Sequence, residues 1–211
     1  NKFDMDAGTL NLTAGTLNIN GEHDDTDKYS MSIASGVTVN ANANHTLALI
    51  DNTSGSSTED RYLDMQGNSI GDLTFNVASS RDLFLTGNQI ILGDLTITTG
   101  EFRSQANNVD VSGAADIDGE IEISTGTVDI DGAFDGTNGT IDFTDAGTLE
   151  LAGTVTSLGT LDNGAGTVKY DGGTQDVLAD DYHKLIIDQS GNKTSQGDVN
   201  VANDMMISNS A

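Results

Sequence analysis

The densest group of oxygen donors in the sequence is a short polar run near its beginning. It contains four acidic residues, Glu22, Asp24, Asp25 and Asp27. Clustered carboxylates on a loop can supply the six to eight oxygens that Ca²⁺ binds. The spacing differs from that of an EF-hand loop, which has Gly at its sixth position and Glu at its twelfth. These residues are therefore candidate Ca²⁺ ligands, and the alternative is a solvated polar turn.

Two further acidic groups have spacings that could serve a cation or a catalytic pair. They are Asp129, Asp131 and Asp135, and Asp116, Asp118, Glu120 and Glu122. In an alternating strand such side chains point outward together, so we expect solvated acidic faces. Glycoside hydrolysis needs two carboxyls about 5–10 Å apart in a groove, one of them with a raised pKa. Binding an acidic sugar would also need basic side chains, and the chain has only 8 Lys and Arg. We predict that the protein is not an enzyme.

Other residue types with catalytic potential are spread along the chain. His23, His45 and His183 lie far apart, and His183 is expected in a surface turn. Nothing in their spacing indicates that they converge on a metal. The sequence has no phosphate loop of the GxxxxGK[ST] type and no arrangement that suggests a Ser-His-Asp triad. No cofactor is predicted beyond Ca²⁺.

The three arginines recur at intervals close to the repeat length of the chain. Arg61, Arg81 and Arg103 are separated by 20 and 22 residues. We expect them to lie near one another on successive coils, with neighbouring acids offsetting their mutual repulsion. Each such exposed ion pair contributes only about 0–1 kcal/mol.

The elements that must position these residues are very short strands. One unit recurs through residues 126–171: a Gly, usually a Thr, and then alternating apolar and polar residues. Copies of it are Gly126–Ile130, Gly139–Phe143, Gly147–Leu151 and Gly166–Tyr170. Period-2 alternation is typical of a half-buried strand, and Gly permits the sharp turn before it. No apolar period of 3.6 is sustained, so the sequence predicts essentially no helix.

A longer repeat organises these strands into coils. Gly71–Phe75 returns as Gly93–Ile97 after 22 residues, and Gly126, Gly147 and Gly166 follow at intervals of 21 and 19. Such a period, with two or three short strands in each repeat, is typical of a β-solenoid. We predict an all-β, single-stranded parallel β-helix of about 20 residues per coil. It forms one domain over residues 1–211, with loop insertions near 21–27 and 51–60. Tandem β-sandwich repeats are the alternative.

Composition and charge exclude several classes of function. The chain has 211 residues without Cys or Pro, and 33 acidic residues against 8 Lys and Arg give a net charge of −25. Nucleic acids and anionic lipids both attract basic surfaces, so neither is an expected partner. The absence of Pro suits a backbone that is paired on both sides. No apolar run reaches transmembrane length, so membrane insertion is not predicted.

The aromatic side chains divide between the predicted core and the surface. Six are expected at or near inward strand positions: Phe3, Phe75, Phe84, Phe134, Phe143 and Tyr170. Four remain for surface contacts: Tyr29, Tyr62, Phe102 and Tyr182. A platform of aromatic rings on one face would favour glycan binding, and the sequence gives no sign that these four cluster.

The two ends of the predicted solenoid are ordinary coil strands. Phe3 and Met5 near the beginning, and Met205 and Ile207 near the end, follow the same alternation as interior strands. No amphipathic capping helix is visible, and a bare coil exposes an unpaired ladder. We expect either a piece of a longer repeat protein or subunits that stack end to end. The beginning at Asn1, without a visible signal peptide, likewise predicts a processed or excised piece.

Residues 166–208 carry a longer motif, of the form GTVxYxG, QxV, YxxLxI and GxKTxxGxVxVxxxLxI. The matching residues are Gly166, Thr167, Val168, Tyr170, Gln175, Val177, Tyr182, Leu185, Ile187, Gly191, Lys193, Thr194, Gly197, Val199, Val201 and Ile207. This segment resembles the repeats of large secreted surface proteins of Bacteroidetes. The resemblance implies an adhesin-like or filament protein with β-solenoid repeats, and it supplies no catalytic residues.

Together these features favour a structural role outside the cell. Our first hypothesis is an extracellular β-solenoid of a surface filament, stalk or adhesin that associates with itself through its ends. The second is a module that binds glycans, other cell-surface components or Ca²⁺ on a lateral face. A polysaccharide-active enzyme is the third.

Overall fold

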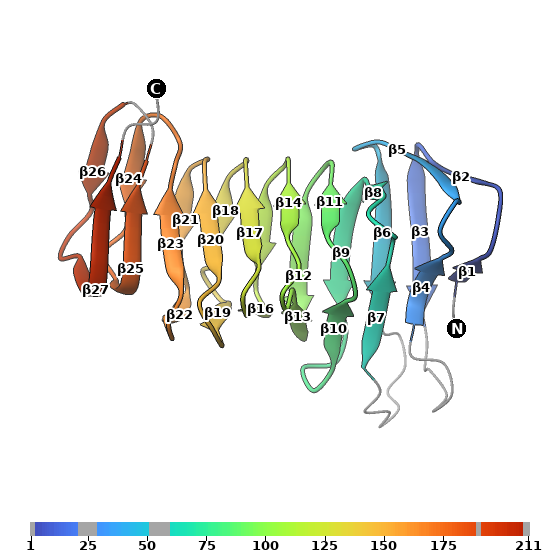
Figure 1. The fold of residues 1–211 in the computed structure, drawn as a ribbon, viewed down its shortest axis with the longest axis horizontal. Coiled ribbons are helices and arrows are strands. Elements are labelled where there is room, and N and C mark those ends of the chain that lie inside the picture. Colours follow the sequence, from blue (N-terminus) through green and yellow to red (C-terminus); the bar gives the residue numbers. More distant parts are fainter. Residues whose placement is uncertain (1–2, 21–28, 51–59, 189–190, 209–211) are drawn as a thin grey trace.

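Parallel β-sheets run along the whole molecule and enclose one core (Figure 1). This computed structural model describes residues 3–20, 29–50, 60–188 and 191–208. Strands from three faces alternate along the chain, so that each of the central coils, of about 20 residues, adds one strand to each face. The described residues contain no helix, and hence none that could span a membrane.

Three long sheets and two short ladders make up these faces. Sheet 1 contains β1 (Phe3–Met5), β4 (Tyr29–Ile33), β7 (Arg61–Asp64), β10 (Asp82–Leu85), β13 (Glu101–Arg103), β16 (Glu120–Ile123), β19 (Thr140–Phe143) and β22 (Thr160–Asp162). Sheet 2 contains β8 (Ser69–Ile70), β11 (Gln89–Ile91), β14 (Val109–Val111), β17 (Thr127–Ile130), β20 (Thr148–Leu151), β23 (Thr167–Tyr170), β25 (Asp181–Ile187) and β27 (Asn200–Ile207). Sheet 3 contains β3 (Gly15–Asn20), β6 (His45–Ile50), β9 (Asp72–Asn76), β12 (Leu95–Thr99), β15 (Ala115–Ile117), β18 (Phe134–Asp135) and β21 (Val155–Ser157). The short ladders pair β2 (Thr9–Leu12) with β5 (Thr38–Ala41), and β24 (Gln175–Val177) with β26 (Lys193–Ser195).

This architecture confirms the predicted solenoid. The strands are parallel and stack coil upon coil, whereas the strands of a β-sandwich are antiparallel. The predicted loop insertions fall largely on residues 21–28 and 51–59, which lie outside the described residues.

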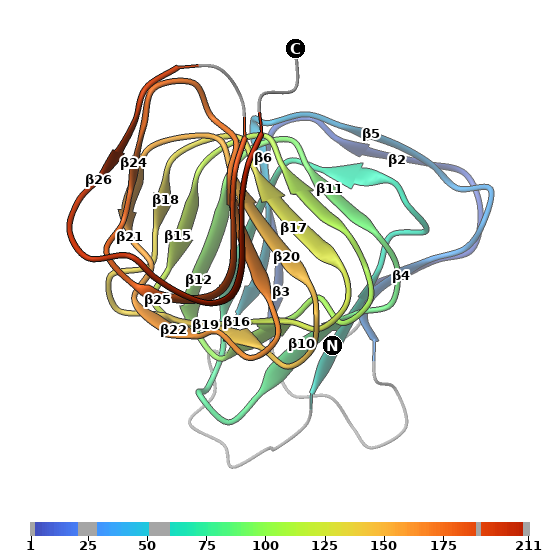
Figure 2. The same ribbon diagram turned by 60° about the vertical axis from the view of Figure 1, so that its left-hand side comes forward.

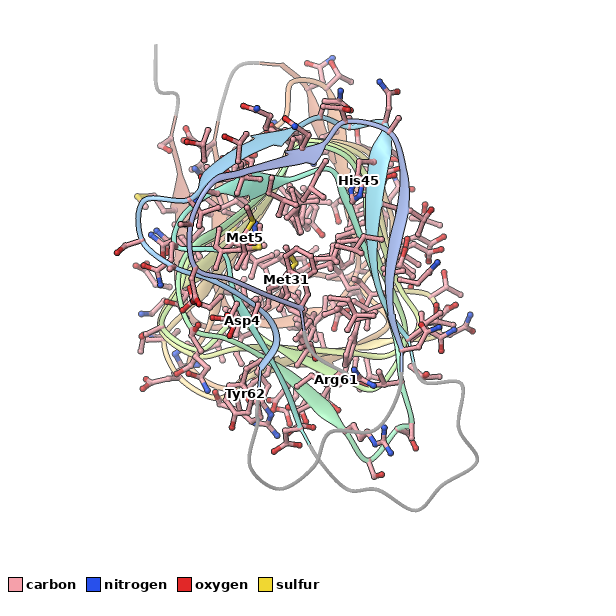
Figure 3. All side chains as sticks on the ribbon, turned by 90° about the vertical axis from the view of Figure 1, so that its right-hand side faces the viewer. Asp4, Met5, Met31, His45, Arg61 and Tyr62 are labelled. Atoms are coloured by element: carbon pink, nitrogen blue, oxygen red, sulfur yellow. The ribbon has the colours of Figure 1, made fainter. Side chains whose placement is uncertain are left out.

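The core is built from apolar rows in strict register. On sheet 2, Val109, Val128, Leu149, Val168 and Leu185 are successive partners, and each is at most 2% exposed. Seen along the axis, Met31 lies inside the coil and Tyr62 on its outer side (Figure 3). Because an aliphatic residue, Val or Leu, repeats at the same position of each coil, a short repeated unit is enough to fill the interior.

A column of glycines marks the corner between sheets 2 and 3. A Cβ at Gly113 would come within 2.4 Å of the Gly93 carbonyl oxygen. A Cβ at Gly132 would come within 2.3 Å of the Gly113 oxygen, and one at Gly153 within 2.0 Å of the Gly132 oxygen. Backbones of successive coils therefore touch here, which explains why the repeat keeps Gly at this position.

Short polar side chains connect successive coils at the same corners. Asp72 Oδ1 accepts a hydrogen bond from the Asp94 amide at 3.0 Å, and Asp94 Oδ1 accepts one from the Ala114 amide at 2.8 Å. On the opposite side of sheet 2, Asn88 accepts from the Asn108 amide at 2.9 Å. Each turn thus caps the backbone of the next coil.

Three aromatic assignments made from the sequence are wrong. Phe84 points outward between the buried Leu83 and Leu85, whereas Phe102 and Tyr182 are buried, at 0% and 1% exposure. Four predicted core rings are indeed buried: Phe75, Phe134, Phe143 and Tyr170. Phe3 is half-buried on the first strand.

Candidate functional site

The outer side of sheet 2 carries a row of charged side chains. Asp110, Asp129, Glu150 and Lys169 are successive partners on β14, β17, β20 and β23. They occupy the polar position of the repeated unit, which the alternation of each strand turns outward. Lys169 is the cation in this row of acids.

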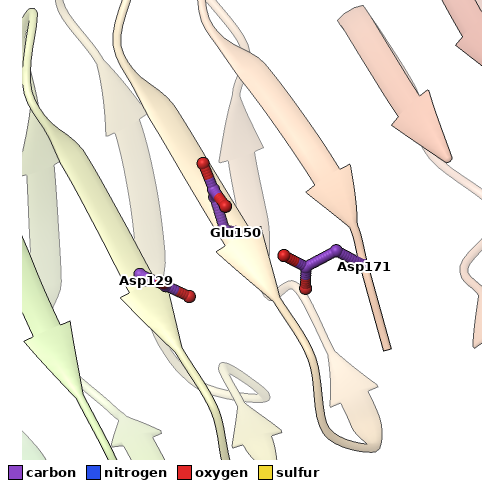
Figure 4. A group of neighbouring side chains, drawn as sticks. All are labelled: Asp129, Glu150 and Asp171. Atoms are coloured by element: carbon purple, nitrogen blue, oxygen red, sulfur yellow. The ribbon is translucent and has the colours of Figure 1, made fainter. Parts of the chain in front are cut away.

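Three carboxylates of this region gather closely. One oxygen each from Asp129, Glu150 and Asp171 lies within 4.8 Å of the others (Figure 4). The Lys169 ammonium lies 2.8 Å from Glu150 Oε2, 3.2 Å from Asp171 Oδ2 and 4.0 Å from Asp188 Oδ2. The single positive charge of Lys169 is therefore shared among three carboxylates.

This imbalance shows in the proton affinities. Burial, and then the charges of Glu150, Asp171, Asp131 and Asp110, raise the pKa of Asp129 to about 6. Burial by itself would lower the pKa of Lys169, but hydrogen bonds to Glu150 and Asp171 outweigh it and raise that pKa. Lys169 stays charged, and Asp129 is the carboxylate that it neutralises least.

The chemistry of this cluster suits a hard cation bound through oxygen. Ca²⁺ takes six to eight oxygens, and three carboxylates can offer at most six. A cation bound here would share Glu150 and Asp171 with the Lys169 ammonium. The Ca²⁺ ligands predicted from the sequence, Glu22, Asp24, Asp25 and Asp27, lie outside the described residues.

The acidic groups singled out in the sequence do not each form one face. Asp129 lies half-buried on sheet 2, whereas Asp135 lies on β18 of sheet 3. Asp116 likewise belongs to sheet 3, and Glu122 belongs to sheet 1 with 6% of its surface exposed. Sequence neighbours were separated because a coil turns a corner between them.

A second charged cluster surrounds Arg103 on the outer side of sheet 1. Its guanidinium bonds Asp82 Oδ2 at 2.7 Å and Glu101 Oε2 at 2.8 Å, and it also bonds Glu122. Burial, and then the charge of Asp82, raise the pKa of Glu101 to about 7, although Arg103 opposes the shift. As on sheet 2, one cation is shared among three carboxylates.

A shallow groove lies beside this cluster, where the chain turns from sheet 3 into sheet 1. Its volume is about 240 Å³, and Glu101, Asp118, Glu120, Asn138 and Thr140 contribute to its lining. Glu101 and Glu120 are partners on adjacent strands. A carboxyl with a pKa near 7 beside a second carboxylate is the pairing that glycoside hydrolysis uses. Here Glu101 is bound to the Arg103 guanidinium, which it shares with two other acids.

The predicted row of stacked arginines is wrong. Arg61 is 1% exposed and lies in register with Leu83 in the interior, whereas Arg103 lies in register with the outward Phe84. Arg81 is buried before β10 begins. The intervals of 20 and 22 residues match the coil, but Arg61 and Arg81 are buried whereas Arg103 lies on the outer side.

An aromatic pair adjoins Arg103 along the same outer row. Tyr62 and Phe84 stack with ring centroids 5.1 Å apart and planes inclined by 16°. The Arg103 guanidinium lies 5.4 Å from the Phe84 centroid. Both faces of the Phe84 ring are thus covered by neighbours along the axis, so Phe84 offers a sugar no open ring face.

The surface turn predicted for His183 is wrong, and His45 is a buried histidine. His183 lies in the middle of β25, not in a turn, and its Nε2 is 3.2 Å from the side-chain Nδ2 of Asn203. His45 begins β6 and is 4% exposed. The alternation His45, Leu47, Leu49 was the signal for an inward histidine. Lys169 could likewise have been placed among the acids by stacking the Gly-Thr units.

Comparison with known proteins assigns the chain to no family. No protein-family model matches it, and the searches of curated proteins and of solved structures found no similar protein. The likeness of residues 166–208 to surface-protein repeats therefore stays a prediction.

Proposed function

We propose that the protein is an extracellular structural β-solenoid, part of a surface filament, stalk or adhesin whose coils stack end to end. The observation that carries the proposal is the outer edge of β27. This strand is the last of sheet 2 among the described residues, and Met205, Met206 and Ile207 on it are 48%, 48% and 74% exposed. Natural edge strands usually carry charges, bulges or a cover that prevents pairing. In β27 the charge of Asp204 and the irregularity in pairing come before this apolar stretch and leave it uninterrupted.

The apolar surface at this edge continues into the interior. Val177, Leu185, Ile187, Val199 and Met205 line an opening of about 160 Å³, together with Lys193 and Ser195. Leu185, Met205 and their neighbours continue the inward rows of sheet 2. A further coil stacked on β27 would bury these side chains as every interior coil does.

The opposite end is formed by the first described coil. β1, β2 and β3 are the first described strands of their ladders, and because every ladder is parallel, the coils at both ends wind in the same sense. A contact between unlike ends with equal polarity is head-to-tail, and such contacts extend into filaments. The net charge of −25 keeps lateral faces apart, which favours growth along the axis.

Electron microscopy and analytical ultracentrifugation of the purified chain over a range of concentrations test the proposal. We expect particles several coil stacks long, in proportions that rise with concentration. Met205→Glu with Ile207→Glu places charges in the inward rows of β27 and should abolish them. Met206→Glu, on the outward side of the same strand, is the matched control. Single rods at every concentration would refute end-to-end association.

The acidic cluster on sheet 2 favours one alternative, a module that binds Ca²⁺ on its lateral face. Asp129, Glu150 and Asp171 supply closely spaced oxygens, and Lys169 forms ion pairs with Glu150 and Asp171 but not with Asp129. Calorimetric titration with Ca²⁺ tests this reading, with Asp129→Asn as the variant that should lose binding. Heat of dilution alone would remove the alternative and leave the filament proposal untouched.

A further inference from the structure

Among the described residues, strand ladders join the first two coils to the rest of the solenoid on two faces. We call residues 3–20 and 29–50, with β1 to β6, the N-terminal coil pair. On sheet 3, β6 pairs with β9 through five residue pairs. On sheet 1, β4 pairs with β7 through three, with an irregularity between Tyr29 and Met31. On the remaining face, β2 and β5 form their own ladder, which is separate from sheet 2 (Figure 2).

The β6–β9 contact is therefore the main connection of this pair. The turn before β6 packs tightly on Gly71 of the third coil. A Cβ at Gly71 would come within 2.0 Å of the His45 carbonyl oxygen and 2.3 Å of the Asn42 carbonyl oxygen. His45 also donates its amide to Asn42 at 3.3 Å. His45 thus lies at the corner where the coil pair meets the third coil, as Figure 3 shows.

The imidazole of His45 is buried there without a partner for one nitrogen. Its Nδ1 is inaccessible and makes no hydrogen bond within the described part of the chain, and the residue is 4% exposed. A neutral ring tolerates an unpaired acceptor, but protonation would turn Nδ1 into a buried charged donor, which costs more.

Few charges face this ring. The titratable residue that acts on it is Asp72 on β9. Asp72 already accepts hydrogen bonds from Thr46 Oγ1 at 3.2 Å and from the Asp94 amide. Strand β3, the turn 42–44 and β6 itself contain no other titratable side chain. Burial lowers the pKa of His45, and Asp72 offsets this only in part.

We propose that His45 is a pH-sensitive contact that holds the N-terminal coil pair on the third coil and releases it when the ring is protonated. Above pH 6.5 the ring is neutral in both the folded and the opened state, and the contact is complete. As the pH falls below 6.5, the opened state takes up the proton first, so opening becomes more favourable. The loss continues down to the lowered pKa of the folded state. This inference does not depend on end-to-end stacking.

Hydrogen exchange of the full chain, corrected for the intrinsic effect of pH, measures the opening directly. Between pH 7.5 and pH 5, we expect hydrogen-exchange protection in β3 and β6 to fall. The fall should be up to about tenfold for each pH unit between 6.5 and the pKa of His45 in the folded state. Protection in β17 and β20 should not fall. NMR titration of the imidazoles should show His45 taking up its proton below pH 6.5.

Two variants separate this contact from a general effect of acid. His45→Gln keeps a polar side chain that does not titrate, and the fall in β3 and β6 should disappear. His183→Gln, on β25 at the other end, should leave the fall unchanged. Should His45→Gln not fold, the NMR titration of the unmodified chain decides. A His45 that titrates at or above pH 6.5, or equal protection of β6 at both pH values, would overturn the proposal.

Discussion

At the scale of single residues, two cations organise the acidic surface. Lys169 lies among Glu150, Asp171 and Asp188, and Arg103 lies among three other acids. With a net charge of −25, the chain has few cations to place. Both are partly buried at the end of a run of acids on an outer row, Asp110, Asp129 and Glu150 before Lys169, and Glu122, Asp142 and Asp162 after Arg103. A positive charge relieves repulsion at such a position.

Replacing Lys169 should therefore destabilise the solenoid more than replacing an ordinary surface lysine. Lys169→Met keeps the aliphatic contacts but leaves the surrounding carboxylates unpaired. We expect a loss of about 1–3 kcal/mol in the free energy of unfolding, measured by urea titration. Lys169→Arg should restore most of it. Lys184→Met is the control, because Lys184 lies on the adjacent strand β25 but in register with Thr167 and not with Lys169. An equal loss of stability in Lys184→Met would contradict the special role of Lys169.

The pKa of Glu101, raised to about 7, predicts a pH dependence of stability. A carboxyl whose folded-state pKa exceeds its unfolded value disfavours the folded state when ionised, so stability should rise as the pH falls through 7. We expect the melting temperature to increase from pH 8 to pH 6.5, a range above that in which His45 acts. Glu101→Gln should flatten this slope. An equal slope in Glu101→Gln and the unmodified chain would show that Glu101 does not take up a proton in this range.

At the scale of elements, the sequence predicts strands and their spacing well, but it predicts the corners poorly. Alternation around Val128 and Leu149 identifies inward residues because one face is apolar and the other polar. The run Leu83-Phe84-Leu85 is apolar on both faces, so alternation could not tell that Phe84 points outward. Asp116 and Glu122 were grouped together because a sequence does not show where a coil turns between sheets.

The glycine column at the corner between sheets 2 and 3 gives a sharp test of coil stacking. Gly132→Ala would place a Cβ 2.3 Å from the Gly113 oxygen. Because the obstacle is backbone of the next coil, relief requires the coils to separate, and we expect a loss of about 1–3 kcal/mol. Gly87→Ala meets no atom within 4 Å and serves as the control. Chemical denaturation of both variants distinguishes a close approach from a mere loss of chain flexibility.

At the scale of the whole molecule, stability follows the stacking of neighbours. Each coil contacts the coils beside it, so the free energy is approximately a sum of coil and interface contributions. The interfaces are unequal, because three ladders join the central coils, two join the N-terminal coil pair to β7 and β9, and among the described strands only sheet 2 continues past β23 to β25. Unfolding should therefore begin at the ends, including the N-terminal coil pair, and not as one cooperative event.

Two core substitutions test this order of unfolding. Leu47 on β6 and Leu149 on β20 are both 0% exposed, and truncating a buried Leu to Ala costs about 2–5 kcal/mol. Leu47→Ala should lower the urea concentration at which β3 and β6 lose hydrogen-exchange protection, while β17 and β20 keep theirs. Leu149→Ala should lower the urea concentration at which the central coils lose protection, so that it approaches the value for the N-terminal coil pair. The separation between the two unfolding transitions should then decrease. If either variant shifted all coils equally, the solenoid would unfold as a single unit, and the two-face attachment would have no thermodynamic consequence.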